Sequence, residues 1–263
     1  MALKAVILAG GLGTRLSEET GIRPKPMVEI GGKPILWHIM KIYSHYNIND
    51  FVICLGYKGY MIKEYFANYF LHQSDIKIDL KNNKIFYYNN YSEPWTVTLI
   101  DTGELTMTGS RIKKIQNFVD DPFLLTYGDA VTNLNISSVL NYHETHPGCL
   151  TMTVVQPDVR FGNVELGEND KITKFHEKNH GDNVQWVNGG FFVCNKKIFD
   201  YIPNGDDVVF EKEPLENLAE DGELFAYRHS DFWKCMDTLR DKVQLEELWK
   251  YNPKWVVWDN ANR

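Results

Sequence analysis

An α/β fold with a mostly parallel sheet is predicted by three features of this 263-residue sequence. Short apolar runs alternate with stretches that carry apolar residues at helical spacing, as parallel strands alternate with their crossover helices. The first apolar run, residues 4–9, stops at the glycine-rich segment 10–13, as a buried strand does when it enters a tight loop. Three short β segments follow one another within residues 76–101 and interrupt the alternation, which indicates an antiparallel insertion.

Each further element is expected from its own pattern. Apolar residues at helical spacing predict helices at residues 34–46, 61–71, 111–118, 211–220 and 238–249. Short β-rich runs predict core strands at residues 51–55, 123–127, 150–155 and 186–193. No repeat, linker or low-complexity segment divides the sequence, so residues 1–263 are expected to form one domain with one insertion.

Composition excludes several classes of partner and site. The net charge of −7 argues against nucleic acid as a main partner, and no apolar run reaches the length of a membrane span. The four cysteines are far apart and form no Cys-x-x-Cys pair, which is typical of reduced thiols rather than of a disulfide frame or a zinc site. We therefore expect a soluble, cytoplasmic protein that handles anionic substrates with local cations and a metal ion.

The glycine-rich segment favours a polyphosphate ligand. Glycines let successive backbone N–H groups approach one phosphate, and Arg15 and Lys25 add a guanidinium fork and an ammonium group. A P-loop is excluded because no Lys-Ser or Lys-Thr follows the glycines, and a dinucleotide fingerprint is excluded because Leu16 occupies the third glycine position. For the glycines alone, an ordinary strand-to-helix turn is the alternative.

Two separate carboxylates are candidate ligands for Mg²⁺. Asp129 follows the predicted strand 123–127, at the sheet edge where ligands of parallel sheets bind, although an Asx-turn would also explain it. Asp237 precedes the last predicted helix, and its pattern alone favours a helix cap, with Thr238 and Asp241 approximating a capping box. Mg²⁺ binds one or two carboxylates together with phosphate oxygens, so the pair would suit it if folding brings them together.

Three later residues are candidates for a sugar phosphate site. Glu177 and Lys178 form a Glu-Lys pair of the kind that is usually a solvated ion pair, and Asn188 opens an Asn-Gly-Gly segment of the kind that is usually a turn or bulge. In a sugar-phosphate enzyme, Lys178 would hold the phosphate, while Glu177 and Asn188 would bind hydroxyl groups.

Residues 8–15 (LAGGLGTR), followed by 24–26 (PKP), resemble the sugar-1-phosphate nucleotidyltransferases. Blocks along nearly the whole chain, such as residues 93–95 and 236–242, are similar to the branch of this family that uses CTP and glucose 1-phosphate. The resemblance implies a Rossmann-like α/β fold and transfer of a cytidylyl group from CTP to α-D-glucose 1-phosphate by Mg²⁺-assisted in-line displacement. The products would be pyrophosphate and CDP-glucose, a precursor of dideoxyhexoses in bacterial lipopolysaccharide O-antigens.

The same resemblance implies roles for single residues. The residues that would bind the nucleotide are Leu8, Ala9, Gly10, Gly11, Leu12, Gly13, Thr14, Thr106, Arg111 and Gly128. Arg15 and Lys25 would contact the phosphates during catalysis. The sugar 1-phosphate would be bound by Glu177, Lys178 and Asn188. Asp129 and Asp237 would bind Mg²⁺. A homo-hexamer is also implied, in which the insertion at residues 76–111 contacts a neighbouring subunit and brings Thr106 and Arg111 to a nucleotide site of either subunit.

Alternatives stay open within the family and beyond it. Ala130, Ser110 and Asn179 replace residues that are common in the family beside substrate loops, which leaves another sugar 1-phosphate, or UTP or dTTP, as alternative substrates. A nucleotide-sugar-dependent glycosyltransferase would share the fold, but the sequence lacks the Asp-x-Asp pair expected of it. A non-catalytic nucleotide-sugar sensor would lose charged groups that are present here.

Overall fold

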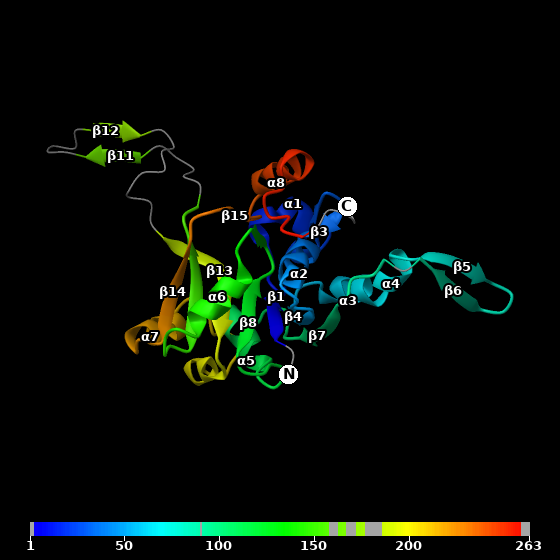
Figure 1. Cartoon of the computed structure of the whole chain (residues 1–263), viewed down its shortest axis with the longest axis horizontal. Coiled ribbons are helices and arrows are strands. Elements are labelled where there is room, and N and C mark those ends of the chain that lie inside the picture. The colour runs from blue at the N-terminus through cyan, green and yellow to red at the C-terminus, as the bar shows by residue number, and fades with distance from the viewer. Residues whose placement is uncertain (1–2, 90, 158–162, 167–171, 177–185, 259–263) are drawn as a thin grey trace.

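The computed structural model describes residues 3–89, 91–157, 163–166, 172–176 and 186–258, and it is built around one seven-stranded sheet (Figure 1). The strands lie in the order β14-β10-β13-β8-β1-β4-β7. Their bounds are β1 Lys4–Leu8, β4 Asp50–Leu55, β7 Thr96–Asp101, β8 Phe123–Tyr127, β10 Leu150–Val155, β13 Val187–Cys194 and β14 Leu224–His229. Every neighbouring pair is parallel except the two that involve β13, which runs antiparallel to both β8 and β10. The predicted α/β class with a mostly parallel sheet is confirmed.

Helices cover both faces of the sheet. They are α1 Ser17–Thr20, α2 Ile35–His45, α3 Gly59–Ala67, α4 Tyr69–His72, α5 Thr108–Lys114, α6 Ile136–His143, α7 Glu213–Glu220 and α8 Leu239–Tyr251. Ala5 and Ile7 of β1 belong to the core cluster that contains α2, α6 and α8, whereas Val6 and Leu8 belong to the cluster that contains α5 and α7. Because successive side chains of a strand point to opposite faces, a strand covered on both sides is apolar throughout.

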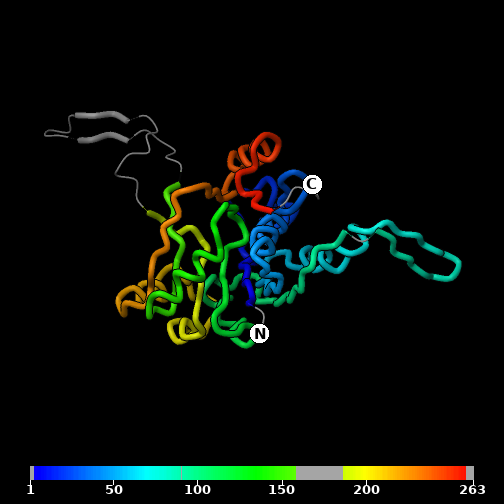
Figure 2. The backbone as a smooth tube through the Cα atoms, in the orientation of Figure 1, coloured from blue at the N-terminus to red at the C-terminus, as the bar shows by residue number. Residues whose placement is uncertain are grey.

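The insertion is a two-stranded hairpin that projects from the body of the protein (Figure 1, Figure 2). Its strands, β5 Asp75–Asp79 and β6 Lys84–Tyr88, pair antiparallel, as the sequence predicts. The third predicted β segment does not belong to the hairpin, because β7 is the parallel edge strand of the main sheet, beside β4. Residues 96–101 therefore extend the core sheet. Within the predicted insertion, antiparallel pairing is limited to residues 75–88.

Two helices differ from their predicted ranges by more than two residues at an end. The helix expected at residues 61–71 is interrupted at Asn68, whose φ of −100° and ψ of 3° separate α3 from α4. The helix expected at residues 111–118 begins earlier, at Thr108, and ends at Lys114. Helix α6 and strand β14 were not predicted from the sequence.

Three short strand pairs lie outside the main sheet and the hairpin. They are β2 Glu29–Ile30 with β3 Lys33–Pro34, β9 Ala130–Thr132 with β15 Trp233–Cys235, and β11 Asn163–Leu166 with β12 Ile172–His176. Each pair is antiparallel. Over the residues that the structure describes, no helix has the length and apolar character needed to cross a membrane.

Candidate active site

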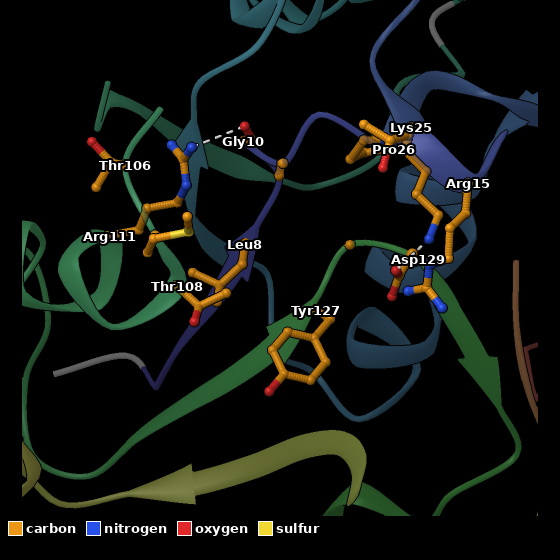
Figure 3. A pocket seen from close by; sticks show the side chains of 16 residues that line it. Leu8, Gly10, Arg15, Lys25, Pro26, Thr106, Thr108, Arg111, Tyr127 and Asp129 are labelled. Carbon is orange, nitrogen blue, oxygen red and sulfur yellow. Dashed lines mark hydrogen bonds and ion pairs between the residues drawn. The ribbon is translucent and has the colours of Figure 1, made fainter. Parts of the chain in front are cut away.

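A cleft of about 310 Å³ opens at the carboxyl ends of β1 and β8, where ligands of parallel sheets bind (Figure 3). Its walls come from the loop after β1, from the turn after β8 and from the segment 106–111 that enters α5. The predicted nucleotide-site residues in its lining are Leu8, Ala9, Gly10, Gly11, Gly13, Thr14, Thr106, Arg111 and Gly128. Leu12 does not line it, and its side chain is exposed. The fold thus brings together residues from three distant parts of the chain.

The glycine loop leaves the sheet with two backbone N–H groups that make no backbone hydrogen bond among the described residues. Ala9 still donates to the Cys54 carbonyl of β4 at 3.0 Å, but no backbone acceptor in the described part of the chain meets the N–H groups of Gly11 or Leu12. Gly13 has a φ of +63°, a left-handed conformation that glycine adopts without steric cost. Such N–H groups are suited to phosphate oxygens.

Arg111 holds this loop in place through hydrogen bonds to backbone carbonyls. Its buried guanidinium donates to the Gly10 carbonyl at 2.9 Å and to the carbonyls of Leu55 and Gly103 at 2.9 and 2.7 Å. A Cβ atom on Gly10 would lie 2.2 Å from Arg111 Nη1, so glycine is needed at this close approach. The sequence interpretation placed Arg111 in the projecting insertion, and this is wrong: Arg111 lies in α5 and contacts the loops that follow β1 and β4.

Thr106 and Gly128 lie in two other walls of the cleft. Thr106 is buried, and its hydroxyl donates to Asp206 Oδ1 at 3.3 Å. Gly128 N donates to the Leu8 carbonyl at 3.0 Å, and a Cβ atom on Gly128 would lie 2.8 Å from that oxygen. Glycine therefore allows the turn after β8 to pass close to β1, and this turn carries the next residue, Asp129, into the site.

Lys25 lies between two carboxylates that are far apart in the sequence. Its Nζ donates to Asp129 Oδ2 and to Asp237 Oδ1, both at 2.7 Å. Arg15 Nη1 adds a second cation, 2.9 Å from Asp237 Oδ2. Figure 3 shows Lys25, Arg15 and Asp129 pointing toward one another at one end of the cleft. Two cations and two carboxylates thus form a cluster whose charges balance.

The strand pair β9–β15 brings Asp237 to Asp129. Immediately beyond this pair, Met236 N donates to the Asp129 carbonyl at 2.8 Å, which fixes the two aspartates on adjacent backbones. The cap of α8 is the next residue, Thr238, and it forms a complete capping box with Asp241. The interpretation of Asp237 as a helix cap is therefore wrong, because its side chain turns to Lys25 instead.

In this cluster, charge pairing affects the pKa values of Lys25 and Asp237 more than burial does. Burial disfavours the charged form of Lys25, but Asp129 and Asp237 more than compensate and raise the pKa of its ammonium above the usual value. Burial also opposes ionisation of Asp237, yet Lys25 and Arg15 lower the pKa of its carboxyl. Nearby Cys235 behaves differently, since burial and the surrounding carboxylates raise the pKa of its thiol to about 12. Lys25 and Asp237 are therefore charged at neutral pH, and Cys235 is a neutral thiol.

Asp129 and Asp237 fit a Mg²⁺ ion that also has ligands from outside the protein. No group of three or more His, Cys, Asp or Glu side chains suited to a metal occurs among the described residues. Mg²⁺ is commonly held by one or two carboxylates, with phosphate oxygens and water completing the shell, and this donor set matches that requirement. Because the charges of the cluster already balance, a polyphosphate bound here would bring negative charge that a divalent cation offsets.

The predicted sugar-phosphate residues are described only in part. Glu177 and Lys178 lie outside the described residues. Asn188 lies in β13, where its Nδ2 donates to the Tyr127 hydroxyl at 3.2 Å and its Oδ1 accepts from Gly190 N at 2.8 Å. Tyr127 lines the cleft, but sequence reasoning did not single it out. Its place at the end of a core strand, directly before the predicted Gly-Asp turn, is the signal that could have found it.

Comparison with known proteins agrees with this site. Residues 4–249 match the family model described as nucleotidyl transferase. The chain belongs to the nucleotidyl transferase family. A glucose-1-phosphate cytidylyltransferase of Salmonella typhi is 53% identical to this nucleotidyl transferase over 260 residues, which cover 98% of this chain and 100% of that protein.

Two solved structures share the fold of this nucleotidyl transferase. HddC from Yersinia pseudotuberculosis has a TM-score of 0.67 with it, over 94% of this chain and 99% of its own, at 24% identity. The inositol-1-phosphate CTP transferase from T. maritima has a TM-score of 0.62, over 95% of this chain and 97% of its own, at 18% identity. At these identities the likeness shows the fold alone.

Proposed function

We propose that this nucleotidyl transferase transfers a cytidylyl group from CTP to α-D-glucose 1-phosphate and releases CDP-glucose and pyrophosphate. The observation that carries the proposal is the 53% identity to the Salmonella typhi protein over its whole length. The cleft supports it, because the glycine loop lies beside two cations and two carboxylates. Charge stabilisation of this kind is what a reaction between two phosphate groups needs.

The reaction is an in-line displacement at the α-phosphorus of CTP. A phosphate oxygen of glucose 1-phosphate forms a new P–O bond as the P–O bond to the departing pyrophosphate breaks. The attacking oxygen is already anionic at neutral pH, so no side chain needs to remove a proton from it. The protein therefore contributes position and charge rather than acid–base chemistry.

Different groups along the cleft would bind the phosphates of CTP, the departing pyrophosphate and the metal ion. The N–H groups of the glycine loop bind phosphate oxygens of CTP. Arg15, whose side chain is 73% exposed, has the freedom to follow the departing pyrophosphate. Lys25, which bridges Asp129 and Asp237, is placed to exchange these contacts for phosphate oxygens when substrates bind. The prolines on either side of Lys25 limit backbone motion, so the exchange is a movement of its side chain.

Asp129 and Asp237 would hold Mg²⁺. When bound, the ion neutralises charge on phosphate oxygens of the substrates. The assignment is supported by the contact of both carboxylates with the Lys25 ammonium, since side chains that share one ammonium are close enough to share one ion. The backbone hydrogen bond from Met236 to Asp129 keeps the two carboxylates together.

A matrix of nucleotides against sugar 1-phosphates, with detection of released pyrophosphate, tests the proposal. CTP, UTP and dTTP would each be combined with glucose, galactose and mannose 1-phosphate in the presence of Mg²⁺. We expect the highest kcat/KM for CTP with glucose 1-phosphate. A higher value for another pair would correct the substrate, transfer of glucose to an acceptor would indicate a glycosyltransferase, and no turnover of any pair would indicate a sensor.

We infer that the projecting hairpin makes contacts in a homo-oligomer, which family resemblance suggests is a hexamer. The hairpin exposes large apolar side chains, namely Ile76, Ile78, Ile85, Phe86, Tyr87 and Tyr88. An isolated two-stranded hairpin is marginally stable in water, so a surface of a second copy would stabilise it. Light scattering at micromolar concentration should give the mass of an oligomer. Replacement of residues 75–88 by a short glycine-serine turn should reduce the number of subunits in that oligomer. A monomeric wild-type protein would contradict this inference.

We infer that the protein works in the cytoplasm. Support comes from its cysteines, since Cys54, Cys149, Cys194 and Cys235 are all free thiols. Fractionation of the source cells, followed by an immunoblot, tests this location, and recovery from a periplasmic or extracellular fraction would contradict it.

A further inference from the structure

Tyr127 is a cleft residue to which the mechanism gives no role. It ends β8, directly before the Gly128-Asp129 turn, and its side chain lines the cleft (Figure 3). Its hydroxyl accepts a hydrogen bond from Asn188 Nδ2 at 3.2 Å and donates one to Glu211 Oε1. One hydroxyl group thus joins β13 to the segment that precedes α7.

Asn188 is held at both ends of its amide. The Oδ1 atom accepts from Gly190 N at 2.8 Å, and the Nδ2 atom donates to the Tyr127 hydroxyl. These two contacts leave one N–H and one lone pair of the amide for a ligand. A half rotation of a free amide would exchange its donor and acceptor, whereas an amide held at both ends presents each at a fixed place.

Glu211 is held by two hydroxyl groups. Its Oε1 accepts from Tyr127, and its Oε2 accepts from Thr108 Oγ1 at 2.6 Å. Thr108 Oγ1 in turn accepts from Phe210 N at 2.9 Å, so the threonine is itself fixed by the backbone. Glu211 is exposed beside the cleft-lining Thr108, and each carboxylate oxygen keeps a lone pair for a further donor.

Tyr127 and Thr108, the cleft-lining residues that bind Asn188 and Glu211, lie apart from the cations of the cleft (Figure 3). In Figure 3 the hydroxyls of Tyr127 and Thr108 point away from Lys25 and Arg15. At the cation end, Lys25 and Arg15 offset the carboxylates of Asp129 and Asp237, so a phosphate meets less repulsion there than beside the carboxylate of Glu211, whereas a neutral hydroxyl group donates well to that carboxylate. A sugar 1-phosphate therefore fits with its phosphate toward Lys25 and its hydroxyl groups toward the other end.

We propose that Tyr127 is a positioning residue for the sugar 1-phosphate, whose hydroxyl fixes Asn188 and Glu211 as the groups that bind the sugar hydroxyls. The proposal deepens the proposed function and rests on it, since it concerns the acceptor of that reaction. Tyr127 acts through its two neighbours and makes no substrate contact with its hydroxyl.

Tyr127→Phe removes the hydroxyl and keeps the ring, together with its packing against Phe192 at 5.8 Å between ring centroids. We expect the KM for glucose 1-phosphate to rise about tenfold, the size of effect that follows loss of a hydrogen bond to a charged group. The KM for CTP, kcat and Tm should stay near their wild-type values. Tyr201→Phe is the matched control, because Tyr201 donates to Asp221 Oδ2 at 2.9 Å outside the cleft lining.

A second measurement separates positioning from direct contact. In an Asn188→Ala, Glu211→Ala background, Tyr127→Phe should leave the KM for glucose 1-phosphate unchanged, because the groups that Tyr127 holds are gone. A further tenfold rise in that background would show that Tyr127 binds substrate itself and would overturn the positioning role. Glu211→Gln, a surface change that keeps the side-chain shape, should raise the same KM several-fold in an otherwise wild-type chain.

The outcomes distinguish this inference from the proposed function. An unchanged KM for the sugar 1-phosphate in Tyr127→Phe overturns the inference, as does an equal rise in the KM of both substrates or a large fall in Tm. If the wild type prefers another sugar 1-phosphate, the proposed function is corrected, and the same constants measured with that sugar decide the role of Tyr127. A wild type that turns over no pair overturns both.

Discussion

Two buried cations, Lys25 and Arg111, flank the same glycine loop, and their partners differ in charge. Lys25 pairs with the carboxylates of Asp129 and Asp237, whereas Arg111 donates to five uncharged oxygens, including the Gly10 carbonyl. A phosphate can replace a carboxylate beside Lys25 because one anion replaces another. Backbone carbonyls have no such replacement, so the cation that holds them belongs to the scaffold.

The pKa values follow the same division. The two carboxylates overcome burial and raise the pKa of Lys25, while burial of Arg111 dominates and lowers the pKa of its guanidinium. Both residues are nearly inaccessible, with 9% and 3% exposed. In this cleft, the charge of the partners therefore distinguishes the cation that is proposed to act in catalysis, Lys25, from the cation that holds backbone carbonyls, Arg111, better than burial does.

The largest effect should come from removing the functional cation. Lys25→Ala should lower kcat/KM by about two orders of magnitude or more, the cost of losing one electrostatic clamp, and should leave the fold intact. Steady-state kinetics and circular dichroism measure these two quantities. Lys197→Ala, which removes a lysine paired with Glu223 outside the cleft, is the control and should keep the wild-type kcat/KM. A folded Lys25→Ala protein with unchanged kcat/KM would end the functional assignment.

Removal of the structural cation should act on stability. Arg111→Met leaves the carbonyls of Gly10, Leu55 and Gly103 without this donor, so we expect a loss of about 2–4 kcal/mol in the free energy of unfolding. Urea denaturation measures it. Lys25→Ala should lose much less in the same experiment, since its carboxylate partners are partly exposed to water. Equal losses in the two variants would break the comparison between the cations.

Asp237→Asn sharpens the functional side of the comparison. An amide is a weaker ligand than a carboxylate, so the Mg²⁺ concentration for half-maximal activity should rise about tenfold or more while Tm stays near the wild-type value. Asp129→Asn should behave in the same way. The double variant should cost less than the two single effects combined, because both residues act on one ion. If titration shows an unaltered Mg²⁺ dependence for Asp237→Asn, this residue is not a metal ligand.

The smallest effect is expected for Thr238, the residue after Asp237, and it should be an effect on stability. Thr238→Ala removes the N-cap of α8 and should lower the free energy of unfolding by about 1 kcal/mol. Its kcat/KM should match the wild type, in contrast to Asp237→Asn, because the cap does not contact Lys25. Thermal unfolding and steady-state kinetics on both variants provide the measurement, and a large loss of kcat/KM in Thr238→Ala would contradict this separation.

Elements with local signals could be predicted from the sequence, and elements defined by distant partners could not. The strand 123–127 and the glycine loop carry their patterns within a few residues. The segment 96–101 reads as a strand, but its residues do not reveal that its partner is β4 rather than the preceding hairpin. A period-two pattern gives the faces of a strand and leaves the neighbour open.

The candidate site shows the same limit. The sequence pointed to Asp129 and Asp237 singly, but their meeting depends on β9 and β15, which are three residues each and too short to show a pattern. Tyr127 was missed because its partners, Asn188 and Glu211, come from other parts of the chain. Arg111 was noticed, but its burial against the Gly10 carbonyl depends on the packing of α5 beside β1.

The strand pair that joins the two aspartates also sets an order of events during synthesis. A chain emerging from the ribosome has all seven strands of the main sheet once it reaches His229, the end of β14. At that length it already carries the glycine loop, Lys25 and Asp129, but Asp237 follows β15 and has not yet been added. Translation that stops near residue 230 would therefore yield a polypeptide with every strand of the sheet and only one of the two carboxylates that are proposed to hold Mg²⁺.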